Sequence, residues 1–73
     1  MSRTIYSKEH RYIVKQLKKA RKEASLSQKQ VAKILRRTQS YISKCESGQR
    51  KIDVIQLKDF AKIYKKNLNY FVR

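Results

Sequence analysis

The sequence predicts an all-α fold made of several short helices, and three observations support this. The 73 residues include no proline and one glycine, and Lys, Leu, Ile, Gln and Ala are frequent, a composition that favours helices over strands. Apolar residues recur three and four positions apart, the spacing of a helix that buries one face. Residues able to cap helix N-termini precede these stretches. Because so short a chain buries only about 60% of its extended surface, we expect one small core in a single domain over residues 1–73.

The first expected helix begins after Ser7, which ends a short N-terminal arm over residues 1–7. Ser7 can cap this helix, and Glu9 places a negative charge in the first turn, where it complements the helix dipole. The apolar stripe consists of Ile13, Val14, Leu17, Ala20 and Ala24. The opposite face is basic and consists of Lys8, Arg11, Lys15, Lys18, Lys19 and Lys22. Such a face is usually solvated, although part of it can instead flank a phosphate backbone.

A second helix begins at a capping box, in which the Ser27 hydroxyl accepts from a backbone N–H and Gln30 reaches back. Its expected buried positions are Val31, Ala32 and Leu35. Arg36 and Arg37 then interrupt the apolar pattern.

A third helix follows Thr38 and runs to about Ser47, where Gly48 suits the left-handed conformation that ends a helix. Ile42 and Cys45 define its inward side. Its outward side carries Ser40, Ser43, Lys44 and Ser47, with Gln39 and Tyr41 beside it near the N-terminal end. Small hydroxyl side chains let a helix enter a groove, and an amide and an ammonium can reach base edges there. Residues 27–47 therefore predict a helix-turn-helix.

The last expected elements are a fourth helix and a short turn. Asp53 and Gln56 form another capping box, followed by a buried stripe of Leu57, Phe60, Ala61 and Tyr64. Asn67 can cap a final short turn that carries Leu68 and Phe71.

The charge of the chain favours a polyanionic partner. Twenty Lys and Arg residues against five Asp and Glu give a net charge of +15. Glu46 is the single acid within residues 27–51, so we expect it to have a structural role. Cys45 is the only cysteine, which excludes an intramolecular disulfide and favours a small buried side chain in a reducing compartment. With no apolar run long enough to cross a bilayer and no signal-peptide core, we expect a cytoplasmic protein associated with the nucleoid.

Residues 17–71 resemble the lambda-repressor and Cro type of helix-turn-helix regulators, the XRE family. The matching residues are Leu17, Arg21, Leu26, Ser27, Gln28, Val31, Ala32, Gln39, Ser40, Ile42, Ser43, Glu46, Gly48, Arg50, Lys51, Leu57, Ala61 and Phe71. The resemblance implies a compact five-helix domain whose third helix enters the major groove of double-stranded DNA. It also implies a homodimer on a pseudo-palindromic operator, with half-sites about 34 Å apart.

The same resemblance assigns expected roles to residues. The positions that contact bases are Gln39, Ser40, Ser43 and Lys44. The positions that contact the DNA backbone are Gln28, Lys29, Arg37, Thr38, Tyr41, Arg50 and Lys51. Arg21 and Glu46 match a structural salt bridge between the first and third helices.

Two positions depart from the family pattern, and two residues near the C-terminus are candidates for contact between subunits. Arg36 and Ser25 stand where the family often has glycine, so strained left-handed backbone is expected at Arg36. Leu68 and Phe71 are expected in the core. Tyr70 and Val72 then point elsewhere and become candidates for a dimer contact.

Other functions are less compatible with the sequence. An enzyme is disfavoured because no carboxylate pair, phosphate loop or metal-ligand spacing accompanies Cys45 and His10. We expect His10 to be an ordinary exposed side chain. No metal or cofactor is expected. A cationic membrane-surface protein built on the first helix leaves the other helices without a purpose. Among DNA-binding modules, a small repressor or autoregulator is preferred. An antitoxin and a restriction-modification controller of the same fold stay open, as does a toxin or polymerase partner.

Overall fold

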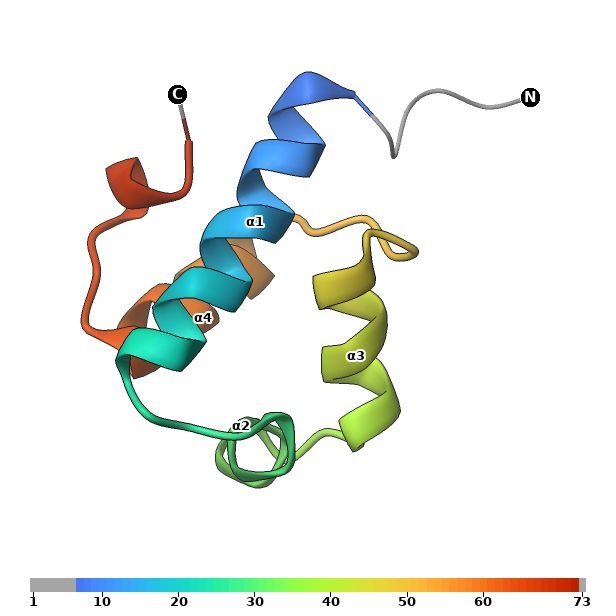
Figure 1. Cartoon of the computed structure of the whole chain (residues 1–73), viewed down its shortest axis with the longest axis vertical. Coiled ribbons are helices and arrows are strands. Elements are labelled where there is room, and N and C mark those ends of the chain that lie inside the picture. Colours follow the sequence, from blue (N-terminus) through green and yellow to red (C-terminus); the bar gives the residue numbers. More distant parts are fainter. Residues whose placement is uncertain (1–6, 73) are drawn as a thin grey trace.

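The computed structural model describes residues 7–72, which form four α-helices and one 3₁₀ turn (Figure 1). The elements are α1 (Lys8–Glu23), α2 (Gln28–Leu35), α3 (Gln39–Ser47), α4 (Val54–Tyr64) and η2 (Leu68–Tyr70). The all-α prediction is confirmed, and the helix-turn-helix lies where residues 27–47 predicted it. The expected fifth helix is wrong, because the segment after Asn67 is a 3₁₀ turn of three residues and the Asn67 side chain makes no capping hydrogen bond. Residues 1–6 of the expected arm lie outside the described residues.

Each α-helix begins at the cap that the sequence predicted. Ser7 Oγ accepts from the His10 backbone N–H (3.1 Å), and Thr38 Oγ1 accepts from that of Tyr41 (3.1 Å). Both capping boxes are present, one at Ser27 and one at Asp53. These local hydrogen bonds satisfy backbone donors that the first turn of a helix leaves unpaired.

Helix ends are closed by left-handed residues, and three of the four described ones are not glycine. Ser25, Arg36 and Lys65 have φ values of 58°, 58° and 57°, whereas Gly48 has 84°. At Arg36 the next residue's N–H donates to Ala32 O (2.8 Å), which is the Schellman arrangement. The left-handed backbone expected at Arg36 is confirmed. A non-glycine residue there costs about 1 kcal/mol.

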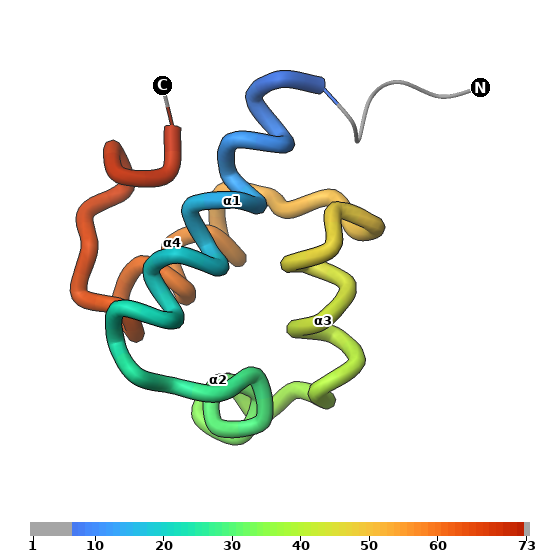
Figure 2. The backbone as a smooth tube through the Cα atoms, viewed as in Figure 1, coloured from blue at the N-terminus to red at the C-terminus, as the bar shows by residue number. Residues whose placement is uncertain are grey.

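The described helices enclose one small core. Figure 2 shows α1 crossing the molecule in front of α4, with α3 on one side and the C-terminal segment on the other. The buried apolar side chains are Leu17, Ala20, Val31, Ala32, Ile42, Cys45, Leu57, Phe60, Ala61, Tyr64 and Phe71. Ala24 is exposed and Leu35 is half-buried, because both lie at helix ends. Three polar residues, His10, Gln16 and Glu46, are also buried.

Candidate nucleic-acid interface

The helix-turn-helix is held together by apolar packing between α2 and α3 and between α1 and α3. Val31 and Ala32 from α2 join Ile42 and Cys45 from α3 in the core. Cys45 is fully buried in this core and is a packed apolar group, and its burial raises the pKa of the thiol above its usual value. With its inward side fixed in this way, α3 presents the opposite side to solvent.

An ion pair ties α3 to α1. Arg21 Nε donates to Glu46 Oε2 at 2.7 Å and Arg21 Nη2 donates to Glu46 Oε1 at 3.1 Å, while the side chains are 13% and 2% exposed. Arg21 Nη1 also donates to Leu26 O (2.9 Å). The hydrogen bond to Glu46 raises the pKa of the Arg21 guanidinium, against the effect of burial. The structure therefore contains the salt bridge that the resemblance implied, and it gives Glu46 the structural role that the charge pattern predicted.

Gln28 joins this network from the first turn of α2. Its Nε2 donates to Glu46 Oε1 (3.1 Å), and the side chain is half-buried. The amide nitrogen carries a second N–H, so Gln28 can keep this bond to Glu46 and still donate to a phosphate. In the described structure Gln28 thus orients the carboxylate that connects the three helices.

The outward side of α3 has the composition that the sequence predicted. Its exposed residues are Gln39, Ser40, Ser43, Lys44 and Ser47. Ser47 Oγ donates to Lys44 O (3.2 Å), so that hydroxyl is bonded to its own helix. Thr38, which caps α3, is exposed as well.

Tyr41 connects the basic residues on one side of α3. The guanidinium carbons of Arg37 and Arg50 lie 4.9 Å and 4.8 Å from the centroid of its ring. The Tyr41 hydroxyl accepts from Gln56 Nε2 (2.9 Å), and Gln56 is itself held by the capping box of Asp53. Burial raises the pKa of Tyr41, which therefore stays neutral. Sequence analysis did not find this arrangement. The signal that could have indicated it is an aromatic residue that lies close to several arginines in the sequence.

These residues line a polar cleft of about 620 Å³ beside the N-terminal half of α3. Its lining residues are Arg36, Arg37, Thr38, Ser40, Tyr41, Lys44 and Arg50. The cleft contains four cations and no acidic side chain, so it can bind an anion. Lys29 and Lys51, two further expected backbone contacts, are exposed outside this cleft.

The C-terminal segment and His10 differ from expectation. Tyr70 packs against the core with its ring edge-on to Phe71 (5.1 Å between centroids), so the prediction that it points away is wrong. Gln16 Nε2 donates to Tyr70 O (3.1 Å), which places this segment against α1. Val72 is 43% exposed. His10 is buried, not exposed, because its Nε2 donates to Gly48 O (3.3 Å) at the end of α3.

Other kinds of site have little support in the part of the chain that the structure describes. Residues 7–72 contain no group of three His, Cys, Asp or Glu side chains arranged to hold a metal ion. Within the same residues, no helix has the length and apolar character needed to span a bilayer.

Comparison with known proteins agrees with the geometry. The family model described as helix-turn-helix, which represents proteins of the lambda-repressor (XRE) type, matches residues 17–71. Searches of curated proteins and of solved structures returned no match. The matched region includes the Arg21–Glu46 ion pair and both helices of the helix-turn-helix.

Proposed function

Since the chain belongs to the lambda-repressor-type helix-turn-helix family of DNA-binding transcription regulators, we propose that it is a small repressor or autoregulator that binds a specific duplex sequence. The observation that carries the proposal is the outward side of α3, where hydroxyl, amide and ammonium groups are exposed beside a cleft lined by cations. A helix of this composition fits the major groove, and the cations fit the phosphates that border it.

Base recognition in this proposal comes from Gln39, Ser40, Ser43 and Lys44. Gln39 makes two hydrogen bonds to adenine, and Lys44 donates to guanine. The two serines allow close approach and bond to nearby base edges. A good bidentate contact contributes about 1–3 kcal/mol of discrimination against a wrong base pair.

Affinity in this proposal comes mainly from the DNA backbone. Arg37, Arg50, Lys29 and Lys51 bind phosphates, and Gln28 donates to one through its second amide N–H. Thr38 and the ring of Tyr41 lie among these groups and contact the same backbone. Neutralised phosphates release counterions, so the logarithm of the binding constant falls linearly with the logarithm of salt concentration. If each domain neutralises about five phosphates, a dimer has a slope near −9.

A homodimer on two half-sites completes the proposal, because one α3 spans only a few base pairs. Val72 is exposed and is a candidate for the two-fold contact, whereas the Tyr70 ring is partly covered by the core. Sedimentation of the protein with and without its DNA site measures the stoichiometry. A single chain bound per site would remove the dimer from the proposal and leave the α3 contacts in place.

The test begins with selection of binding sites from random duplexes by the purified protein. Gln39→Ala and Lys44→Ala are then measured on the selected and a scrambled duplex, beside Arg50→Ala and Lys51→Ala. We expect the first two substitutions to reduce the preference between duplexes and the last two to weaken both equally. Equal behaviour of all four variants would contradict direct base recognition by α3, and no duplex binding by the parent protein would contradict the proposed function.

A further inference from the structure

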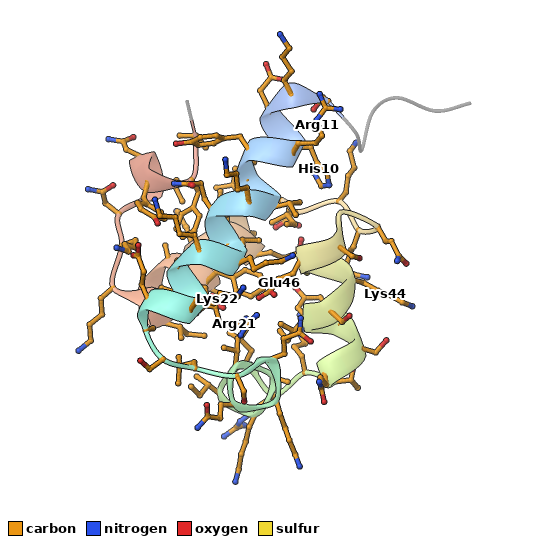
Figure 3. All side chains as sticks on the ribbon, in the orientation of Figure 1. His10, Arg11, Arg21, Lys22, Lys44 and Glu46 are labelled. Atoms are coloured by element: carbon orange, nitrogen blue, oxygen red, sulfur yellow. The ribbon has the colours of Figure 1, made fainter. Side chains whose placement is uncertain are left out.

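A second cleft, the α1–α3 groove, combines an apolar interior with a positively charged edge. It lies between α1 and the C-terminal end of α3 and has a volume of about 630 Å³. Most of its exposed lining is apolar, and the residues that line it include five cations and no acid. Figure 3 shows Arg11 near one end of α1 and Lys22 near the other, while Lys44 lies on the side of α3 away from α1.

Contacts within the protein fix the shape of this groove. His10 Nε2 donates to Gly48 O (3.3 Å) across 38 residues of sequence. A Cβ atom built on Gly48 would lie 3.9 Å from Val14 Cγ2, so α1 and the end of α3 are already in van der Waals range. Val14 is half-buried and lines the groove at this point. A partner therefore meets a preformed surface, which lowers the cost of binding.

Four cations form a single row along the α1 side of the groove. They are the exposed residues Arg11, Lys15, Lys18 and Lys22. These positions are four, three and four residues apart, so their side chains leave the helix within about 60° of one another over a length of about 16 Å. The ion pairs among the described residues are Arg21–Glu46 and Lys66–Glu23. No carboxylate of the described chain therefore pairs with this row.

The spacing of the row and the apolar interior favour an acidic amphipathic helix as the occupant. A helix lying along α1 repeats its side chains at the same three- and four-residue intervals, so its carboxylates can meet successive cations. Its adjoining apolar side chains can then pack on Val14 and on the methylene groups of the lysines.

A membrane surface fits this groove less well. Binding in the plane of a membrane requires a helix with a broad exposed apolar face. The large apolar residues that are exposed in the described chain are Ile34, Val54, Ile55 and Val72, and all of them lie outside α1. The apolar surface of the α1–α3 groove is instead narrow and recessed between two helices, which suits one inserted stripe of side chains.

We propose that the α1–α3 groove docks an acidic amphipathic helix of a partner protein. Carboxylates of the partner pair with the cationic row of α1, and its apolar side chains pack against Val14 beside Gly48. This is the binding mode in which a helix lies in a groove and is held by anchors three and four residues apart. The inference does not use the DNA contacts of α3 and stands apart from the proposed function.

The test measures binding of two synthetic peptides by fluorescence anisotropy at about 150 mM salt, where attraction between distant charges is screened. The probe peptide has about four helical turns, with glutamates three and four positions apart and leucines along the adjoining stripe. The control peptide has the same residues in an order without an apolar stripe, so the two peptides have equal charge. We expect the parent protein to bind the probe at least about tenfold more tightly than the control peptide.

Two sets of substitutions with the same change in charge locate the bound probe. The first set is Lys15→Gln, Lys18→Gln and Lys22→Gln in the row. The matched set is Lys58→Gln, Lys62→Gln and Lys65→Gln, three exposed residues in α4 and at its C-terminal end. Loss of three exposed ion pairs should weaken probe binding about tenfold in the first set. The second set should change it less than about threefold.

A second pair of variants tests the apolar interior. Val14→Asn should weaken probe binding about fivefold, because the leucine stripe loses its apolar partner. Its control is Ile55→Asn, at a residue of α4 that is 72% exposed, and this variant should bind the probe as the parent does. Circular dichroism and urea denaturation establish that each variant is folded. Titration of the unmodified protein, followed by NMR, should shift the backbone amide resonances of Val14, Lys18 and Gly48 most.

Three results would overturn the inference. Equal affinity for the two peptides would show that net charge alone attracts them. Equal losses in the two lysine sets, or resonance shifts centred outside the groove, would place the peptide elsewhere. Sedimentation with vesicles of equal parts phosphatidylcholine and phosphatidylserine covers the other occupant: if Val14→Asn abolishes vesicle binding but leaves probe affinity unchanged, the groove binds a membrane surface instead. Because no measurement uses DNA, each of these results leaves the proposed function untouched.

Discussion

Replacing Glu46 with alanine should destabilise the domain strongly, because three side-chain donors lose their acceptor at once. Arg21 Nε and Nη2 and Gln28 Nε2 all donate to this carboxylate, which is 2% exposed. Breaking a buried ion pair costs about 3–5 kcal/mol. The Arg21 side chain is 13% exposed and keeps its bond to Leu26 O, so part of the guanidinium can be rehydrated. We therefore expect a loss at the lower end, about 3 kcal/mol.

That loss is a large part of the total stability. At about 0.05–0.15 kcal/mol per residue, a domain of this length has about 4–11 kcal/mol available. A change of 1 kcal/mol shifts the melting temperature of such a domain by about 4–8 °C, so Glu46→Ala should melt about 12–24 °C lower. Urea denaturation followed by helical circular dichroism measures the free energy of unfolding directly.

The chain supplies its own control for this experiment. Glu23 accepts from Lys66 Nζ at 3.0 Å, but their side chains are 47% and 29% exposed. Exposed pairs contribute about 0–1 kcal/mol, so Glu23→Ala should barely change the urea midpoint. If Glu46→Ala and Glu23→Ala unfold at the same urea concentration, the buried network does not stabilise the fold as argued.

Three further predictions concern single residues. Tyr41→Leu should weaken binding to every duplex about threefold to tenfold while leaving the salt slope unchanged, because the ring orients Arg37 and Arg50 without adding charge. As a control, Tyr41→Phe should bind within about twofold of the parent. A reduced salt slope for Tyr41→Leu would contradict this role. Arg36→Gly should raise the free energy of unfolding by about 0.5–1 kcal/mol, since glycine adopts a φ of 58° without strain; a destabilised variant would show that the Arg36 side chain supports the fold. Cys45, which is fully buried and whose pKa is raised by burial, should react with Ellman's reagent only after denaturation, and prompt labelling of the native protein would show that the α2–α3 core opens easily.

The parts of the fold that sequence analysis predicted are those determined by nearby residues. The cap at Ser7, Thr38 or Asp53 depends on a hydrogen bond to a residue three positions along the chain. The outward side of α3 followed from helical spacing and the apolar character of Ile42 and Cys45. In each case the relevant partners lie within one turn of the helix.

What sequence analysis missed depends on residues brought together by packing. His10 is buried because Gly48, 38 residues away, accepts its hydrogen bond, and no local pattern indicates that contact. Likewise the hydroxyl of Tyr41 accepts from Gln56 only because the fold brings the first turn of α4 next to this side chain. The arrangement of two arginines around one ring is consequently visible only in three dimensions.

Two of the left-handed residues that end the helices add positive charge to the surface at the cost of backbone strain. Arg36 and Lys65 are cations in the left-handed backbone conformation, which glycine adopts with less strain. A variant with glycine at both positions should resist heat better, yet it would attract polyanions less strongly and associate with them more slowly, because its net charge falls. At these two positions, a substitution that increases thermal stability therefore decreases the rate of association with a polyanion.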